Sequence, residues 1–386
     1  MEFDWTEAQR ARYGQTLDAV RAAFPDDESA PAGGSAAPGT YYDRKDWLLL
    51  GQLGLLGLSV PARFGGAGLG ALDTAHQVEA LGRGCARTGL VFGASAHLFA
   101  CAMPVVDFGT EELRRRILPG MCSGELIAGN AMTEDEAGSD VSRLAVTARR
   151  AAGGWVLNGE KSFVSNGPAA DVFVTYATTD PGAGHLGVTG FVVDRAAPGV
   201  HPGEPMDKMG LSQCPAGSVR FTECFVPDSA VLGEPGQGGM IFQHSMGWER
   251  ACLFAGYVGL ADRLIEVCTR QVRERRQFGK RIADFQAVSH RLADMALRTE
   301  AARLLLYRAC WEMDEGRPAT LSIALSKLAV SEGVLSTALD AVRLFGGRGY
   351  LRADGIEAAL RDAVPSVIFS GTSDIQRQLI ARELGL

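Results

Sequence analysis

The residue best placed to move a proton is Glu249, which stands in a run of apolar side chains. Met246 and Trp248 lie within three positions of it. Burial among such residues raises the pKa of a carboxyl group towards neutrality, where the group can act as a general base on a weakly acidic C–H. The alternative is that Glu249 pairs with Arg250 or Arg263 on a helix surface, with no role in chemistry.

Two segments are rich in the small and hydroxyl residues that line ligand sites. They read Met132-Thr133-Glu134-Asp135-Glu136-Ala137-Gly138-Ser139-Asp140 and Phe163-Val164-Ser165-Asn166. Small residues let backbone N–H groups approach a ligand closely, and hydroxyls supply donors and acceptors. Taken alone, the first segment fits an ordinary Asx or Ser turn equally well, and Phe163 fits a core residue of a sheet.

Two further segments could bind phosphate groups. Residues 273–280 read Arg-Glu-Arg-Arg-Gln-Phe-Gly-Lys, with Gln286 eight residues after Phe278. Guanidinium groups bind a pyrophosphate in a bidentate way that lysine does not match, but the same run also fits a solvated helix end. Residues 344–350 read Leu-Phe-Gly-Gly-Arg-Gly-Tyr. This turn is weak evidence by itself, because helix C-termini use glycine as well.

The elements that carry these segments fall into three parts, which are residues 1–127, 128–234 and 235–386. Apolar spacing predicts helices in the first part, with a loop at Pro25–Gly39. In the middle part strand-like runs alternate with Pro and Gly, and Asn158-Gly159 predicts a hairpin turn. Long proline-free runs in the last part predict an antiparallel bundle. The expected fold is mainly α, with a small antiparallel β-barrel or sandwich in the centre and a C-terminal four-helix bundle.

The composition is that of an ordinary globular protein, with 46% of the 386 residues hydrophobic and 22% charged. The formal net charge of −7 argues against a nucleic-acid surface. We expect no secretory signal and no membrane span, since the best apolar run, at 48–60, is short and broken by glycine. Eight cysteines without Cys-x-x-Cys pairs predict reduced core thiols in a cytoplasmic protein rather than a metal site.

Together these segments resemble the signatures of the acyl-CoA dehydrogenases. Residues 132–140 resemble the Thr-Glu-x-x-Ala-Gly-Ser-Asp motif, with an acidic pair where Pro-Gly is usual, and 368–377 resemble the C-terminal motif. In most of the family a catalytic glutamate precedes Gly-Thr-Ser, but this chain has Ser370 there. In a branch that includes isovaleryl-CoA dehydrogenase, the glutamate precedes the arginine matched by Arg250. The resemblance therefore implies Glu249 as the catalytic base.

The same resemblance implies FAD as the cofactor and a set of residues that bind it. These residues are Met132, Thr133, Gly138, Ser139, Phe163, Ser165, Arg275, Phe278, Gln286, Arg343, Gly347, Thr372 and Asp374. Arg343 and Asp374 each stand where glutamine is usual. In the family the element around Phe278 reaches the FAD of a neighbouring subunit, so a homotetramer is expected.

Within the family the chain is most similar to L-prolyl-carrier-protein dehydrogenases, notably over 245–255 and 326–333. Those enzymes oxidise a prolyl group, thioester-linked to a peptidyl carrier protein, to pyrrolyl-2-carboxyl, which feeds pyrrole-containing secondary metabolites and antibiotics. The resemblance implies a pocket for the small ring that is formed by Met246, Trp248, Arg250, Phe369 and Ser370. The partners it implies are the carrier protein and an electron acceptor, either a flavoprotein or oxygen.

Three alternatives remain open. A short branched-chain acyl-CoA dehydrogenase of the isovaleryl type would accept free CoA thioesters. A flavin-dependent monooxygenase of the same fold would need no base at Glu249 and would receive reduced flavin from a partner. A non-catalytic subunit of an assembly would bind flavin poorly.

Overall fold

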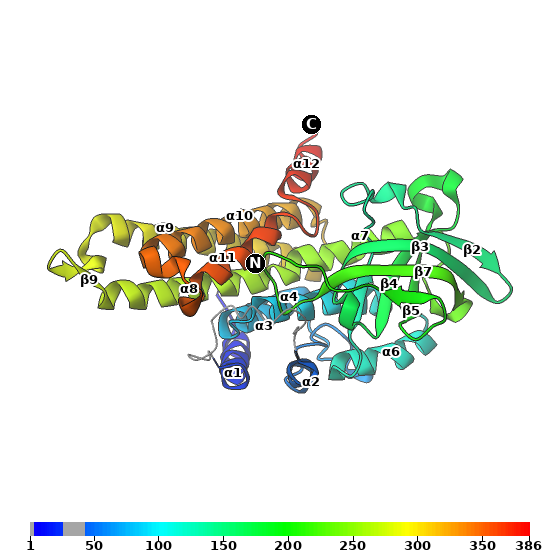
Figure 1. Ribbon diagram of the computed structural model, residues 1–386, viewed down its shortest axis with the longest axis horizontal. Coiled ribbons are helices and arrows are strands. Elements are labelled where there is room, and N and C mark those ends of the chain that lie inside the picture. The colour runs from blue at the N-terminus through cyan, green and yellow to red at the C-terminus, as the bar shows by residue number, and fades with distance from the viewer. Residues whose placement is uncertain (1–3, 26–42) are drawn as a thin grey trace.

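The computed structural model describes residues 4–25 and 43–386. The C-terminal helices lie at one end of the molecule and the β domain at the other, with N-terminal helices along one side (Figure 1). Of the loop expected at Pro25–Gly39, all but Pro25 lies outside the described residues.

The N-terminal part is helical, as expected. Its helices are α1 Glu7–Ala23, α2 Arg44–Gln52, α3 Ala71–Gly84, α4 Thr88–Ala96, α5 Met103–Phe108 and α6 Glu111–Ser123. Thr6 begins α1 with a capping box, because its side chain accepts from the backbone of Gln9 while the Gln9 side chain accepts from the backbone of Thr6. A π-helical segment, η2 His97–Ala102, joins α4 to α5 without a break.

The expectation that no apolar run reaches membrane-spanning length was wrong. Thr88–Phe108 and Thr320–Tyr350 are both long and apolar enough to cross a bilayer by length and composition. An 18-residue window of the first has a mean hydropathy of 1.7, and 89% of that window is buried inside the protein. A helix that is apolar on all sides is what the centre of a large helical core requires, so this burial accounts for its sequence.

The middle part forms an eight-stranded sheet in the order β6-β7-β3-β2-β4-β5-β8, with β1 paired to β4. The strands are β1 Ala128–Ala131, β2 Thr147–Ala151, β3 Gly154–Ser165, β4 Val172–Thr178, β5 Val188–Asp194, β6 Val200–Pro202, β7 Ala216–Pro227 and β8 Val231–Leu232. Most pairings are antiparallel, as expected, but β1 runs parallel to β4 and β2 meets β4 in parallel at one position. A long connection separates β1 from β4 along the chain, which is the condition for a parallel pairing.

The hairpin turn expected at Asn158-Gly159 is absent, because both residues lie inside the continuous strand β3. Gly159 has φ +129°, and the register against β7 shifts between Leu157 and Gly159, so the pair forms a bulge. The Asn158 amide bonds across the sheet, donating to Glu223 Oε1 at 2.7 Å and accepting from the Glu223 backbone at 2.8 Å. The turn between β2 and β3 lies instead at Ala152-Gly153.

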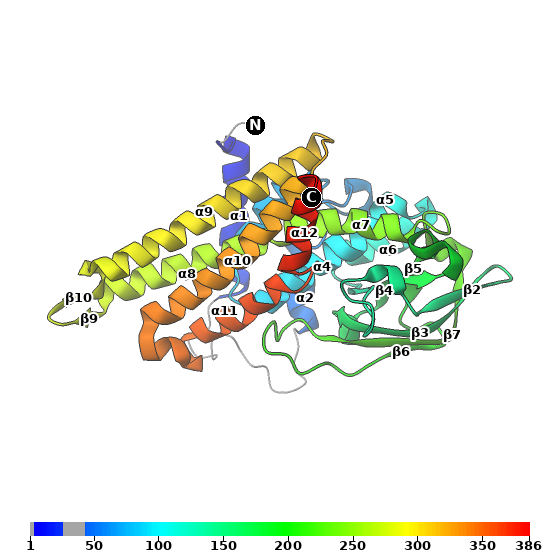
Figure 2. The same cartoon turned by 90° about the horizontal axis from the view of Figure 1, so that it is seen from above.

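The C-terminal part is the expected helical bundle (Figures 1 and 2). Its helices are α7 Gly238–Trp248, α8 Ala255–Glu274, α9 Gln286–Asp314, α10 Thr320–Phe345, α11 Ile356–Ala363 and α12 Ser373–Glu383. The helices α8, α9 and α10 lie side by side, and α11 and α12 pack on α10. A short hairpin of β9 Arg276–Gln277 and β10 Lys280–Arg281 forms the tip between α8 and α9. The predicted run from α7 into α8 is interrupted by a π-helical segment, η7 Glu249–Leu253.

Candidate active site

Glu249 is the first residue of the π-helical segment η7 and is 8% exposed. Single π-helical turns inside α-helices occur often at functional sites, because the wider turn re-aims side chains. The second π-helical segment, η2, packs directly against η7. It brings the buried thiol of Cys101 close enough to Glu249 for the carboxylate charge to add to the effect of burial in raising the pKa of that thiol. The carboxylate therefore lies in the core, where two irregular helical turns meet.

The Glu249 carboxylate accepts a hydrogen bond on Oε1 from the Ser370 hydroxyl. Burial raises the pKa of Glu249 above its ordinary value, while the Ser370 hydrogen bond and the positive charges of Arg250 and Lys327 oppose this rise. Ser370 occupies the place where a carboxylate was expected, and its hydroxyl faces the carboxylate that the helix supplies. The alternative interpretation, in which Glu249 forms an ion pair on a helix surface, does not fit, because the carboxylate is buried.

The backbone of Ser370 is held from two helices. Arg250 Nε donates to the Ser370 carbonyl at 2.8 Å. Gln376 Nε2 donates to the same carbonyl at 3.3 Å and to the Gly371 carbonyl at 3.1 Å, and Gln376 is fully buried. Two successive residues of η7 therefore bind Ser370, one at its side chain and one at its main chain.

A buried lysine supports the chain just before Ser370. Lys327 on α10 is fully buried, and its Nζ donates to the Ser366 carbonyl at 3.0 Å. Burial and the charge of nearby Arg250 lower the pKa of Lys327 to about 8, so it remains protonated at neutral pH. The Ser331 hydroxyl lies 3.0 Å from the same carbonyl. Neither Lys327 nor Ser331 was singled out by sequence, because a lysine in a long helix gives no sign of its burial.

Aromatic rings surround the residue before Ser370. The ring of Phe369 lies 4.6 Å from that of Phe92 and 5.3 Å from that of Phe254, measured between centroids. Trp248 stacks on Phe99 with 6.5 Å between the ring centroids and the two ring planes almost parallel. The predicted pocket residues border Glu249. Met246 and Trp248 lie on α7, Arg250 lies on η7, and Phe369 and Ser370 lie just before α12.

The two small-residue segments lie side by side. The Ser162 backbone N–H on β3 donates to the Thr133 carbonyl at 2.8 Å, just beyond the end of β1. Phe163, the next residue, has φ +53° and a side chain that is 63% exposed. Met132 is buried, while Gly138 and Ser139 are exposed on the turn that follows. An exposed aromatic ring next to exposed small residues is a surface on which a flat ring system can stack.

A buried ion pair supports this surface from below. Lys161 is fully buried, and its Nζ donates to Glu134 Oε1 at 2.8 Å and to the Met132 carbonyl at 3.0 Å. The Glu134 carboxylate also accepts the backbone N–H groups of Ala145 and Val146, at 2.5 and 3.1 Å. Burial lowers the pKa of Lys161 to about 8, which leaves it protonated at neutral pH. The pair fixes the backbone on which Met132 and Thr133 lie.

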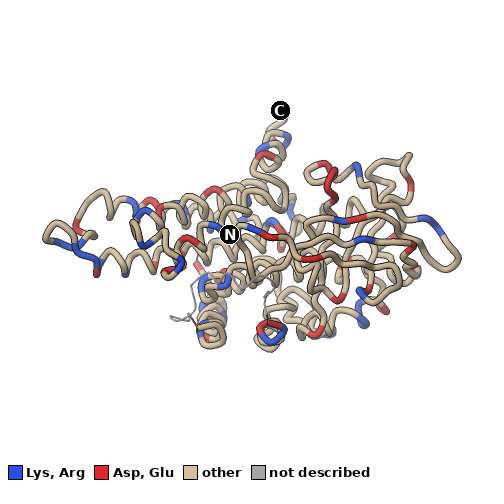
Figure 3. The backbone as a smooth tube through the Cα atoms, viewed as in Figure 1, with Lys and Arg blue, Asp and Glu red and all other residues tan. Residues whose placement is uncertain are grey.

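Three of the predicted FAD-binding residues lie far from this surface. Arg275 ends α8 just before the hairpin, Phe278 lies in the turn of the hairpin, and Gln286 begins α9 nearby. The tip is at the end of the bundle away from the sheet (Figure 1), and Lys and Arg gather there (Figure 3). Phe278 has φ +50° and is 92% exposed. One chain therefore does not bring this group together with Phe163.

The remaining predicted FAD-binding residues follow α10 and precede α12. Arg343, in the last turn of α10, donates to Asp340 Oδ1 at 3.1 Å, and Gly347 is exposed in the segment that follows. Thr372 caps α12 by accepting from the Ile375 backbone at 3.2 Å, and Asp374 is exposed in the first turn of that helix. Thr372 is two residues from Ser370, so this end of α12 is tied to the site around Glu249.

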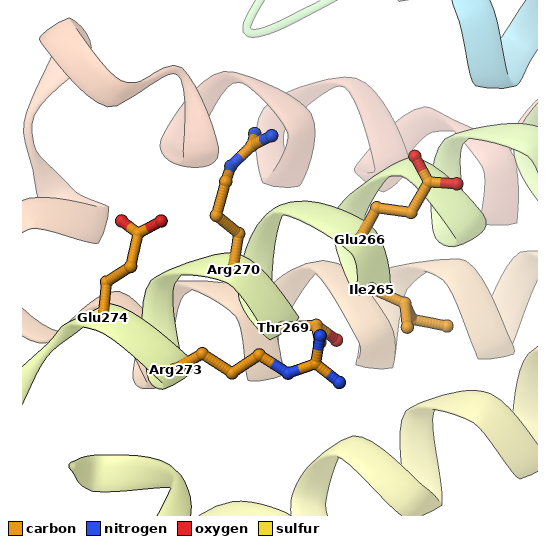
Figure 4. Close-up of a pocket in the computed structure, with 6 residues that line it drawn as sticks. All are labelled: Ile265, Glu266, Thr269, Arg270, Arg273 and Glu274. Carbon is orange, nitrogen blue, oxygen red and sulfur yellow. The ribbon is translucent and has the colours of Figure 1, made fainter.

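A surface hollow of the described residues lies elsewhere. It lies along α8, has a volume of about 490 Å³ and holds none of the predicted site residues (Figure 4). It is lined by Ile265, Glu266, Thr269, Arg270, Arg273 and Glu274. Its charges are balanced and its lining comes from a single helix, so we assign it no role in catalysis.

His97 ties the helical domain to the sheet and makes the fold sensitive to acid. Its Nδ1 accepts from the Ala128 backbone at 3.0 Å, so its Nε2 carries the proton that faces the Met121 carbonyl at 3.1 Å. Burial lowers the pKa of His97 to about 4. Because the unfolded histidine binds its proton at about 6.5, the unfolded chain holds more protons between pH 6.5 and 4, and stability falls as the pH drops through that window.

We expect His97 to account for about 3 kcal/mol of stability lost on acidification from above pH 6.5 to below pH 4. Urea unfolding followed by circular dichroism at a series of pH values measures this. The H97Q variant should lose part of the pH dependence, while the buried His76, whose pKa burial also lowers to about 4, retains its own share. Substituting the exposed His201 by glutamine serves as the control and should leave the part of the dependence assigned to His97 in place. An H97Q profile that is parallel to the wild-type profile would contradict this account.

Comparison with known proteins gives these observations a context. Acyl-CoA dehydrogenase models of the N-terminal, middle and C-terminal domains match residues 7–125, 129–224 and 236–385. The chain belongs to the acyl-CoA dehydrogenase family.

Its similarity to named members of the family is high. It is 57% identical over 347 residues to an L-prolyl-[peptidyl-carrier protein] dehydrogenase of Pseudomonas fluorescens, covering 90% of this chain and 91% of that protein. A solved structure named PigA with FAD and proline has a TM-score of 0.95 and 42% identity, covering both chains fully. Isovaleryl-CoA dehydrogenase of Solanum tuberosum is 37% identical over 88% of this chain and 82% of its own length.

This member of the family is a flavin-dependent dehydrogenase, and FAD is its cofactor. The residues present fit such a group. Phe163 offers an exposed ring, and the Lys161–Glu134 pair fixes the adjoining backbone. Beside Gly138 there is open space, since none of the described residues beyond its chain neighbours has an atom within 4 Å of a Cβ added there. Sequence reasoning identified the motif that holds Glu134 but gave that residue and Lys161 no role. A lysine at an otherwise apolar position of a strand was the signal that could have pointed to the pair.

Proposed function

We propose that this enzyme oxidises a prolyl group, carried as a thioester on a peptidyl carrier protein, to a pyrrolyl-2-carboxyl group, with Glu249 as the base. The buried Glu249 carboxylate, bonded to a serine where a second carboxylate was expected, is the observation that carries the proposal. Similarity to the prolyl-carrier-protein dehydrogenase of Pseudomonas fluorescens supports the choice of substrate. Conversion of the saturated ring to pyrrole removes two hydride equivalents and two protons.

Glu249 removes the proton from Cα, the carbon beside the thioester carbonyl. This C–H is weakly acidic, so the base must be positioned and its pKa must be raised. Burial raises the pKa of Glu249 in that direction. Bound FAD supplies the acceptor for the hydride. An external electron acceptor, a flavoprotein or oxygen, must then remove the electrons after each of the two oxidations.

The substrate ring lies among the aromatic side chains next to Glu249. We assign its pocket to Met246, Trp248, Arg250, Phe369 and Ser370. The close contacts of Phe369 with Phe92 and Phe254 favour a short, flat group over a long acyl chain. The binding of a carrier protein rather than free CoA would be decided outside this pocket, along the arm that bears the thioester.

The two separate groups of FAD-binding residues fit a homotetramer in which neighbouring subunits share each flavin. Met132, Thr133, Gly138, Ser139, Phe163 and Ser165 would bind the FAD of their own subunit, together with Thr372 and Asp374. Arg275, Phe278, Gln286, Arg343 and Gly347 would reach the FAD of a neighbour. Phe278, which is 92% exposed at the far end of the bundle, supports this arrangement. The division into residues 1–127, 128–234 and 235–386 and a cytoplasmic location complete the proposal.

The test is an anaerobic reaction of the FAD-loaded enzyme with prolyl-carrier protein and, separately, with isovaleryl-CoA. We expect the flavin absorbance to bleach with the carrier-bound prolyl group only. Once an acceptor is supplied, the acyl mass should fall by four hydrogens. Bleaching with isovaleryl-CoA instead would make the enzyme a branched-chain acyl-CoA dehydrogenase. No bleaching with either substrate would exclude both dehydrogenase assignments and favour the monooxygenase.

A further inference from the structure

Ser370 has a backbone conformation that its side chain disfavours. Its φ is +56°, in the left-handed region, and Gly371 follows at φ +85°. A residue with a Cβ is strained in this region and glycine is not, so glycine would serve the turn better. A strained non-glycine residue persists where the surrounding structure and a function of its side chain require it. The serine hydroxyl must therefore contribute something that glycine could not.

The hydroxyl has one partner among the described hydrogen bonds, Oε1 of Glu249. The strained backbone aims it there, because Arg250 and Gln376 both hold the Ser370 carbonyl and thereby fix the rotation of the residue. Lys327 holds the Ser366 carbonyl four residues earlier. The position of the hydroxyl is thus set from η7, α10 and α12 together.

We propose that Ser370 is a positioning residue for the base, whose hydroxyl orients the Glu249 carboxylate towards the substrate and favours its charged form. This inference rests on the proposed function. A hydroxyl that donates to a carboxylate stabilises the ionised state, and the loss of that donor in a buried site leaves an acceptor unsatisfied. A carboxylate at 370 would do the reverse, because it would place a like charge beside Glu249.

The direction of the pKa shifts agrees with this role. Burial raises the pKa of Glu249, and the Ser370 hydrogen bond is the largest effect that opposes the rise. The other ionisable groups that act on this site are Arg250 on η7, Lys327 on α10, Cys101 on η2 and Tyr176 on β4. The thiol of Cys101 and the phenol of Tyr176 remain neutral, since burial raises the pKa of each. Removal of the hydroxyl should therefore raise the pKa of Glu249.

Two variants test the proposal, S370A and S370G, in the FAD-loaded enzyme. Both lack the hydroxyl, but glycine relieves the backbone strain, so S370G should melt at a higher temperature than S370A. We expect both variants to slow flavin reduction by prolyl-carrier protein about tenfold, with little change in KM. The acidic limb of the pH–rate profile should move to higher pH, since the base must be ionised to act. The exposed Ser336 on α10, changed to alanine, is the matched control.

Infrared difference spectroscopy of the enzyme without substrate separates this inference from the proposed function. The carboxylic acid band that disappears in E249Q belongs to Glu249, and its titration midpoint should be higher in S370A and S370G than in the wild type. An unchanged midpoint in both variants would overturn the role of Ser370, whatever the substrate is. If the midpoint is raised in both variants but prolyl-carrier protein does not reduce the enzyme, Ser370 keeps its role as a positioning residue and only the proposed substrate is rejected.

Discussion

Replacement of Glu249 by glutamine is expected to lower the rate of flavin reduction by about 10²- to 10⁴-fold, the range that a positioned general base supplies. Glutamine has nearly the same shape, and its amide oxygen can still accept from the Ser370 hydroxyl, so folding and FAD binding should change little. The pH profile of the remaining rate should no longer fall on the acidic side, because residue 249 has no carboxyl group left to be protonated. Stopped-flow absorbance under anaerobic conditions, over a range of pH, measures both effects.

The control for this variant is E315Q, which changes an exposed carboxylate just after α9. It should reduce its flavin at the wild-type rate. An E249Q enzyme that keeps its bound FAD and is reduced within threefold of the wild-type rate would reject Glu249 as the base. In that case a proton acceptor outside η7 would have to be sought.

The sequence predicted the helix–sheet–helix order of the fold and the burial of Glu249, because local patterns encode both. Long proline-free runs predict helices wherever they occur, and the apolar residues around Glu249 correctly indicated its burial. The eight cysteines are all buried and free, as their spacing indicated. The wrong prediction of a hairpin turn at Asn158-Gly159 shows where local patterns fail. The Asn-Gly pair is typical of a turn, but its hydrogen bonds to Glu223 on the neighbouring strand hold these residues in the middle of β3.

The missed residues are those whose role depends on partners far along the chain. Lys327 meets Ser366 across 39 positions, and Lys161 meets Glu134 across 27. Nor does a hydropathy pattern distinguish a π-helical turn from an α-helical one, so the break at Glu249 could not be predicted. Such contacts are products of tertiary packing and become visible only in the folded chain.

Replacement of Lys161 by methionine is expected to destabilise the protein by about 3–5 kcal/mol, the cost of leaving one member of a buried ion pair without its partner. Methionine fills a similar volume, so the effect is largely that of the uncompensated Glu134 carboxylate. That group retains its bonds from Ala145 and Val146. The Met132 carbonyl loses its donor at the same time, so FAD should also bind more weakly. Urea unfolding and the fluorescence of released FAD measure the two effects.

The double variant K161M/E134Q distinguishes the charge from the packing. Since glutamine carries no charge but can still accept from both backbone N–H groups, the double variant should regain part of the stability that K161M loses. K45M changes an exposed lysine on α2 and should remain near the wild type. If K161M proves as stable as K45M, or if the double variant is less stable than K161M alone, the pair does not hold the flavin surface as described. If the double variant regains stability but not FAD binding, the hydrogen bond from Lys161 to the Met132 carbonyl is needed for FAD binding, and the Lys161–Glu134 ion pair is needed for stability.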